Sequence, residues 1–151
     1  MKIRRPKIAD VKKIHSLINQ AAEKGKVIPR SLLEIYESLR DFVVVEEAGK
    51  IVGCCALHIS WEDLAEIRSL VVLPEKQGKG LGKALLRAAL RDAKRLEISK
   101  VFVLTTNPLF FQKNGFEEVK KERLPQKIWG DCLKCPKFPN CDEVALWKEL
   151  S

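Results

Sequence analysis

Apolar side chains recur with helical spacing in two long segments of the chain and in one short one. Across residues 8–22 they return every three or four positions, and Gly25 is available to end that helix. A second period begins after Ser31, which has Glu34 three residues later in the spacing of a capping box. The third runs over residues 80–96. The pattern therefore predicts two helices near the N-terminus and a long one in the middle of the chain.

Short runs rich in β-branched residues predict the strands. These runs lie at residues 42–47, 51–60, 65–73, 101–105, 116–120 and 144–148. Ala48-Gly49-Lys50 joins the first two runs as a hairpin-like turn, and residues 108–114 suit a brief helix closed by Gly115. The order α, α, β, β, β, α, β, α, β, β predicts a mixed α/β layer architecture. A length of 151 residues is typical of one domain, so residues 1–151 are expected to form a single domain.

The composition is that of a folded, globular protein. Hydrophobic residues make up 46% of the chain and charged residues 32%, which excludes the apolar-poor signature of disorder. The first residues are charged without an apolar block behind them, and the longest apolar run, residues 51–59, is too short to cross a bilayer. We therefore expect a cytoplasmic protein with no signal peptide, no membrane anchor and no membrane partner.

The chain is basic, with 28 Lys and Arg against 20 acidic residues and a net charge of +8. A basic surface attracts polyanions, which makes nucleic acid one candidate partner. However, acidic residues are interspersed with the basic ones, and no aromatic-rich RNA-binding signature accompanies them. We therefore expect a solvated Lys/Glu surface and no nucleic-acid partner.

A glycine-rich segment leads from the third predicted strand into the long helix. Residues 71–83 read Val-Val-Leu-Pro-Glu-Lys-Gln-Gly-Lys-Gly-Leu-Gly-Lys. Gly78, Gly80 and Gly82 carry no side chains that would keep a phosphate from the backbone N–H groups at a helix N-terminus. The spacing fits neither a P-loop nor a dinucleotide fingerprint. The segment predicts a cradle for a pyrophosphate, with a purely structural turn as the alternative.

The stretch Gln77-Gly-Lys-Gly80-Leu-Gly82 resembles the acetyl-CoA loop of the GNAT superfamily of N-acetyltransferases, Gln/Arg-x-x-Gly-x-Gly/Ala. The resemblance extends to residues 65–72 and to Phe-Phe-Gln-Lys-Asn-Gly-Phe at 110–116. It implies a mixed, mostly antiparallel central sheet flanked by helices, with splayed central strands. It also implies acetyl-CoA as co-substrate, with the acetyl carbonyl near the amides of residues 70–72 and the diphosphate on those of 78–83.

By the same resemblance, a set of residues would contact the coenzyme. They are Leu70, Val71, Val72, Gln77, Gly78, Lys79, Gly80, Leu81, Gly82, Lys83, Asn107, Phe110, Phe111 and Lys113. Members of the superfamily commonly carry a tyrosine at the place of Phe111, where it protonates the departing CoA thiolate. Phenylalanine cannot donate a proton, and Asn107 could offer a hydrogen bond instead, with a helix N-cap as its alternative role.

A finer resemblance is to the short N-acetylglutamate synthases of bacterial arginine biosynthesis. It rests on residues 28–32, 56–58, 61–70 and 124–143. It implies transfer of the acetyl group to the α-amino group of L-glutamate by direct attack in a ternary complex. Two alternatives stay open: another amine, such as a protein N-terminus, a lysine or a polyamine, or a sensor that binds CoA and zinc without turnover. A homodimer is also left open.

An amino acid presents an ammonium ion that must lose a proton before it can attack a thioester, so a base is required. The candidate base is Glu66. Strand alternation predicts that its side chain lies on the same face as those of Arg68 and Leu70. The alternative is that Glu66 and Arg68 form an ordinary surface pair. An acceptor with two carboxylates needs two cationic side chains to bind it. Arg30 and Arg68 are the first candidates, and Lys127 is a third.

The five cysteines fall into two groups. Cys54 and Cys55 lie inside an apolar run and are expected in the core. Cys132, Cys135 and Cys141 have a spacing that could hold zinc, with free thiols or a disulfide as alternatives and no evident fourth ligand. Of the two histidines, His58 is expected on a strand facing the cleft wall and His15 on the surface of the first helix.

Overall fold

The computed structural model describes residues 1–125 and 143–150. The helices in these ranges are α1 (Val11–Glu23), α2 (Leu32–Glu37), α3 (Leu81–Arg95) and α4 (Pro108–Lys113). The strands are β1 (Lys2–Arg4), β2 (Phe42–Glu47), β3 (Lys50–Trp61), β4 (Leu64–Val72), β5 (Lys100–Thr105), β6 (Glu117–Val119) and β7 (Val144–Glu149). The sequence predicted each of these helices, and each strand except β1.

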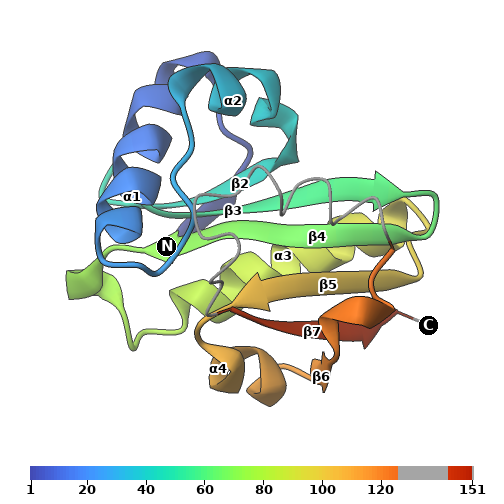
Figure 1. The fold of residues 1–151 in the computed structure, drawn as a ribbon. Coiled ribbons are helices and arrows are strands. Elements are labelled where there is room, and N and C mark those ends of the chain that lie inside the picture. Colours follow the sequence, from blue (N-terminus) through green and yellow to red (C-terminus); the bar gives the residue numbers. More distant parts are fainter. Residues whose placement is uncertain (126–142, 151) are drawn as a thin grey trace.

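The strands form one mixed sheet in the order β1-β2-β3-β4-β5-β7-β6. Neighbouring strands are antiparallel, except that β4 and β5 run parallel. Helix α3 packs on one face of the sheet through Leu85, Leu86 and Ala89, and α1 packs on the other. Figure 1 shows α3 crossing behind the strands, with α1 and α2 above them. The predicted α/β class and its mostly antiparallel sheet are confirmed.

The edge strand β1 has three residues, only one of them apolar, which is too little pattern to predict a strand. It pairs antiparallel with β2 from Lys2↔Glu46 to Arg4↔Val44. The Arg4 guanidinium bonds Glu46 at 2.9 Å and Asp10 at 2.8 Å, which ties the strand to the start of the first helical segment. The bond from Arg4 holds the pKa of the Asp10 carboxyl below its usual range.

The central strands splay, as the family resemblance implied. Parallel pairing of β4 with β5 stops at Ile67↔Val103, although β4 continues to Val72 and β5 to Thr105. Opposite β3, the register changes from Ala56↔Arg68 to Cys54↔Val71, so two residues of β4, Ser69 and Leu70, face Cys55. Ser69 has a φ of +53°, in the left-handed region. A β-bulge therefore lies in β4 where it leaves β5.

The bulge corrects one expectation. Strict alternation predicted Leu70 on the same face as Glu66 and Arg68. Instead, Leu70 packs with the core on the α3 side, and Val71 packs with the core on the α1 side. The extra residue shifts the side-chain parity of the strand by one position, which alternation alone cannot anticipate.

The capping box of α2 and the two cysteines of β3 are as predicted. Ser31 Oγ accepts from Glu34 N–H at 3.1 Å and Glu34 Oε1 accepts from Ser31 N–H at 3.1 Å, which completes the capping box. Cys54 and Cys55 are fully buried, and burial raises the pKa of Cys54 to about 12 and that of Cys55 as well. The expected core role of the two cysteines is confirmed.

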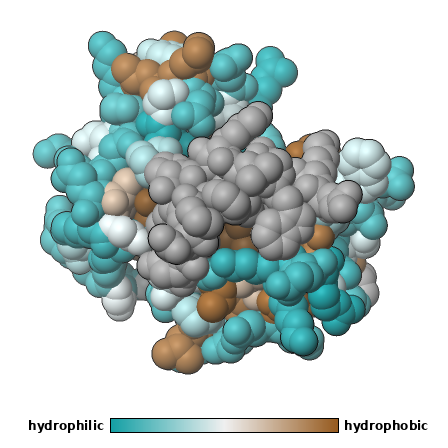
Figure 2. All heavy atoms as spheres, viewed as in Figure 1, coloured by the Kyte–Doolittle hydropathy of each residue, from teal (hydrophilic) through white to brown (hydrophobic). Residues whose placement is uncertain are grey.

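The visible surface is mostly hydrophilic, with an apolar patch at the top of the view in Figure 2. There, the outer face of α2 exposes Leu32, Leu33 and Tyr36. No helix within residues 1–125 and 143–150 has the length and apolar character needed to cross a membrane.

Candidate functional site

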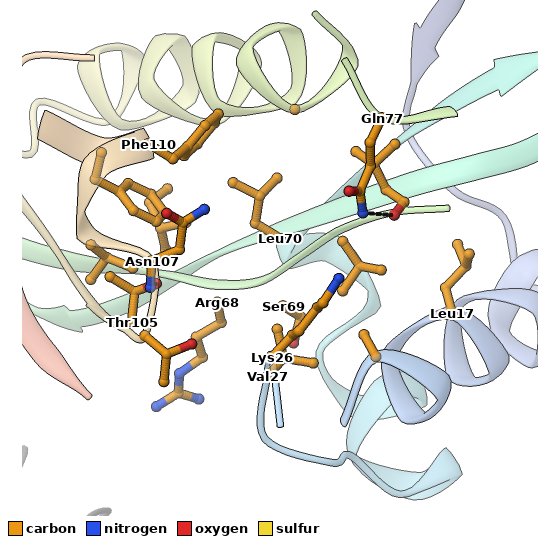
Figure 3. A pocket seen from close by; sticks show the side chains of 18 of the residues that line it. Leu17, Lys26, Val27, Arg68, Ser69, Leu70, Gln77, Thr105, Asn107 and Phe110 are labelled. Atoms are coloured by element: carbon orange, nitrogen blue, oxygen red, sulfur yellow. Dashed lines mark hydrogen bonds between the residues drawn. The ribbon is translucent and has the colours of Figure 1, made fainter. Parts of the chain in front are cut away.

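A pocket of about 720 Å³ opens where β4 and β5 stop pairing. Its walls come from α1, the α1–α2 segment (residues 24–31), the second half of β4, the glycine-rich loop and the junction of β5 with α4. Figure 3 shows Leu17, Lys26 and Val27 entering from the α1 side, and Asn107 and Phe110 from the α4 side. Elements that lie far apart in sequence thus share one cavity.

The glycine-rich loop forms one end of this pocket. Gly78 and Gly80 have φ values of +80° and +82°, which only glycine adopts without strain, and a Cβ on either would meet nothing within 4 Å. Gly80 is the N-cap of α3, so the first N–H groups of that helix have no partner within the helix. Gln77 ties the loop to β4 through its Nε2, which donates to the Val72 carbonyl at 3.1 Å. The loop therefore offers open backbone donors to an anion.

The second half of β4 forms the floor of the pocket. Residues 69–72 line it, and beyond Ile67 the edge of β4 that points away from β3 has no partner in β5. Unpaired strand groups of this kind can accept an extended ligand as an additional strand. The splay thus creates a binding edge out of backbone atoms alone.

Glu66 and Arg68 lie together in the first half of β4, on the side away from the glycine-rich loop. Arg68 Nε donates to Glu66 Oε1 at 2.7 Å, and the two side chains are 19% and 13% exposed. They lie on the α1 face, opposite His58 and Ala56 of β3. Both side chains line the pocket. Glu66 and Arg68 therefore form the ion pair that the alternative predicted, but the pair lines the pocket.

The α1–α2 segment lines the part of the pocket around Glu66 and Arg68. Arg30 lines the pocket as predicted, and its Nη1 lies 3.4 Å from Glu34 Oε2. Lys24 and Lys26 also line the pocket, and we did not single them out in the sequence. The signal was available, since Glu-Lys-Gly-Lys at residues 23–26 lies one residue before residues 28–32, which carried the finer resemblance.

The junction of β5 and α4 closes the opposite wall. Asn107 stands at the N-cap position of α4, yet its side chain makes no capping hydrogen bond. Its backbone N–H donates to Thr105 Oγ1 at 2.9 Å. Phe111 packs edge-on against Phe110 and Phe116, at centroid distances of 5.1 and 5.3 Å. The hydroxyls of Thr105 and Thr106 also belong to the lining and were not predicted.

Most of the predicted coenzyme residues line the same pocket. They are Leu70, Val71, Val72, Gln77, Gly78, Gly80, Leu81, Gly82, Lys83, Asn107, Phe110 and Phe111. Lys79 and Lys113 are not among the lining residues, and coenzyme contact stays a prediction for the whole set.

The expectation that His58 faces the cleft wall is wrong. His58 does not line the pocket: its Nδ1 lies 3.2 Å from Asp41 Oδ2 at the edge of the α1 face. Asp41 and His58 are 17 residues apart, and no motif or periodicity predicts this contact.

Several predicted residues lie outside the described ranges. They are Lys127, Cys132, Cys135 and Cys141. Within residues 1–125 and 143–150, no group of three or more His, Cys, Asp or Glu side chains could hold a metal ion. The zinc site and the role of Lys127 therefore stay predictions.

Comparison with known proteins gives a consistent picture. The sequence profile of the acetyltransferase (GNAT) domain matches residues 38–118. The chain is 42% identical to uncharacterized N-acetyltransferase CT2212 of Chlorobaculum tepidum over 148 residues, covering 98% of this chain and 96% of that protein. It is 39% identical to an amino-acid acetyltransferase of Mycobacterium tuberculosis over 136 residues, covering 87% of this chain and 77% of that protein.

A solved structure is similar across almost the whole chain. It is N-acetylglutamate synthase from Neisseria gonorrhoeae, complexed with coenzyme A and N-acetyl-glutamate. The TM-score is 0.90 at 28% identity, over 99% of this chain and 35% of that one. The splayed strands, the glycine-rich loop and these similarities lead to one conclusion: the chain belongs to the GNAT family of acetyltransferases.

Proposed function

We propose that this acetyltransferase moves the acetyl group of acetyl-CoA to the α-amino group of L-glutamate, a step of arginine biosynthesis. The observation that carries the proposal is that one pocket holds open backbone donors at one end and Glu66, Arg68 and Arg30 at the other. The similar Neisseria gonorrhoeae structure, which contains coenzyme A and N-acetyl-glutamate, supports this choice of acceptor.

The coenzyme half of the proposal uses backbone atoms. The diphosphate rests on the amides of residues 78–83, with the dipole of α3 and the Lys83 ammonium adding favourable potential. The pantetheine arm follows the free edge of β4, and the thioester carbonyl accepts from the amides near residues 70–72. Hydrogen bonds to this oxygen stabilise the negative charge that develops there when the carbonyl is attacked.

The charge of the lining favours an anionic acceptor. Among the described lining residues, six are Lys or Arg and two are Glu. The basic residues are Lys24, Lys26, Arg30, Arg68, Lys76 and Lys83, and the acidic ones are Glu66 and Glu143. A polyamine would need an acidic pocket, whereas a dicarboxylate suits this one. Arg30 and Arg68 can each bind a carboxylate in a bidentate manner, which lysine cannot do.

Glu66 is the proposed general base. It takes a proton from the substrate ammonium, and the resulting amine forms a C–N bond with the thioester carbon. The nitrogen of the tetrahedral intermediate gives up one further proton to water, and the C–S bond then breaks and releases the CoA thiolate. Since Phe111 offers no proton, the sulfur leaves as the anion, with the Asn107 side-chain amide as a hydrogen-bond donor. The Arg68–Glu66 bond keeps the carboxylate oriented toward the pocket.

Direct attack is preferred over an acetyl-cysteine intermediate. Cys54 and Cys55 are fully buried and do not line the pocket, and burial raises the pKa of both thiols. A buried thiol of this kind is a poor nucleophile because so little of it ionises. Neither residue can therefore carry the acetyl group to the acceptor.

A thiol-release assay tests the acceptor directly. Purified protein with acetyl-CoA is offered L-glutamate, L-glutamine, spermidine and a lysine peptide, and free CoA is measured. We expect the highest kcat/KM with L-glutamate, because the cationic lining pairs with both of its carboxylates. A preference for another amine would overturn the glutamate assignment and leave the acetyltransferase in place. Coenzyme binding without thiol release from any amine would favour the sensor alternative.

Replacing the proposed base should slow the reaction without unfolding the protein. Glu66→Gln keeps an oxygen for Arg68 but cannot take a proton, so we expect kcat to fall by about 10²-fold. The remaining rate should rise about tenfold per pH unit below the pKa of the free amine, because only deprotonated substrate then reacts. Glu62→Gln, in the exposed β3–β4 turn, is the matched control. A normal rate and pH profile in Glu66→Gln would exclude Glu66 as the base.

Removing a carboxylate-binding cation should affect one substrate only. We expect Arg30→Ala to raise the KM for L-glutamate by about 10- to 100-fold, the cost of one charged hydrogen-bonded contact. The KM for acetyl-CoA should change little. Arg40→Ala removes the same charge from an exposed position outside the pocket and should change neither constant. An equal rise of both constants in Arg30→Ala would contradict the proposed role.

A further inference from the structure

One side chain outside the pocket holds the backbone of the α1–α2 segment. Asn19 lies on α1 and does not line the pocket. Its Oδ1 accepts from the Arg30 N–H at 3.2 Å, and its Nδ2 donates to the Arg30 carbonyl at 2.9 Å. A single amide thus satisfies both main-chain groups of the residue that carries a proposed acceptor-binding guanidinium.

The other end of the segment is fixed by the end of α1. Gly25 has a φ of +73°, and its N–H donates to the Ala22 carbonyl at 2.9 Å. Lys26 N–H donates to the Ala21 carbonyl at 3.1 Å, a pattern typical of a glycine-terminated helix. Between these two attachments lie Val27 and Ile28, which line the pocket. Asn19 therefore makes the second of two attachments that set the path of this wall.

Helix formation does not account for asparagine at this position. Asparagine forms helices less well than alanine. The hydrogen bond from Asn19 Nδ2 to the His15 carbonyl, at 2.9 Å, stays within α1 and adds little to the stability of the helix. The contacts that distinguish Asn19 are the two to Arg30, eleven positions along the chain.

We propose that Asn19 is a positioning residue for acceptor recognition: by clamping the Arg30 backbone, it fixes the wall that selects the acceptor. The proposal rests on the proposed function of Arg30. Without the clamp, the segment between Gly25 and Ser31 gains backbone freedom, which the acceptor must remove again when it binds. The cost appears in acceptor binding, because the glycine-rich loop and β4 do not depend on Asn19.

Three variants give the kinetic test. Asn19→Ala deletes the clamp while improving helix propensity, so α1 stays formed. Asn19→Asp keeps the shape but turns a carboxylate oxygen toward the carbonyls of His15 and Arg30, which both require a donor. Ser16→Ala, which removes a hydroxyl whose hydrogen bond stays within α1, is the control. We expect about a tenfold rise in the acceptor KM for both Asn19 variants, with little change in the KM for acetyl-CoA or in kcat. The control should resemble the parent protein.

Limited proteolysis tests the clamp without any substrate. Of the three tryptic sites in residues 24–31, those after Lys26 and Arg30 lie beyond Gly25, in the part that the clamp holds. Under native conditions, we expect Asn19→Ala to be cut at these two bonds at least about fivefold faster than the parent and Ser16→Ala, with cleavage elsewhere unchanged. The products are identified by mass spectrometry.

The two measurements separate the possible failures. Unchanged cleavage in Asn19→Ala overturns the clamp itself. Faster cleavage with an unchanged acceptor KM shows that the clamp has no role in recognition, which also overturns the proposal. If the protein does not acetylate L-glutamate, the proposed acceptor fails, and the same KM comparison is made with the amine that the panel identifies. Faster cleavage together with a selective rise in that KM supports the proposal.

Discussion

The site depends on backbone groups of β4 and β5 beyond the point where these two central strands stop pairing. A parallel pair that continued past Ile67↔Val103 would satisfy its own N–H and C=O groups and leave no room for a ligand. The bulge at Ser69 and Leu70 turns β4 away from β5 instead. Buried or half-buried backbone groups need partners, so this edge is suited to an extended polar molecule.

The surrounding elements each occupy one side of that opening. The glycine-rich loop and α3 provide backbone donors at one end, where Gly80 has a backbone conformation suited to glycine alone. The α1–α2 segment provides basic side chains at the other end. Under the proposed function, coenzyme and acceptor would enter from opposite ends and meet beside Glu66. This arrangement allows direct transfer without a covalent intermediate.

Much of this could be predicted from the sequence, because the informative signals are local. The capping box of Ser31 and Glu34 and the glycine-rich loop depend on residues that are adjacent in the chain, and the structure has both where they were expected. The mostly antiparallel sheet with splayed central strands was implied by the family resemblance, whereas the order of its strands was not predicted. Glu66, Arg68 and Arg30 were each predicted by matching a chemical need to a residue type; all three line the pocket, and their roles stay predictions.

The features that sequence reasoning missed are those set by tertiary contacts. A β-bulge adds one residue to one strand without a sequence signal, which is why Leu70 was assigned to the wrong face. His58 was expected at the cleft wall, but its partner is Asp41 on a separate element. The clamp of Asn19 on Arg30 joins positions that no periodicity connects.

The central claim is that backbone amides of the glycine-rich loop bind the coenzyme, and calorimetry with CoA tests it most directly. We expect saturable binding to the parent protein at one site and a weakening of at least about tenfold in Gly80→Ala, since alanine is strained at a φ of +82°. Gly49→Ala, strained in the same way in the β2–β3 turn, should bind CoA as the parent does. No heat with CoA at millimolar concentration, or equal weakening in both variants, would contradict the account.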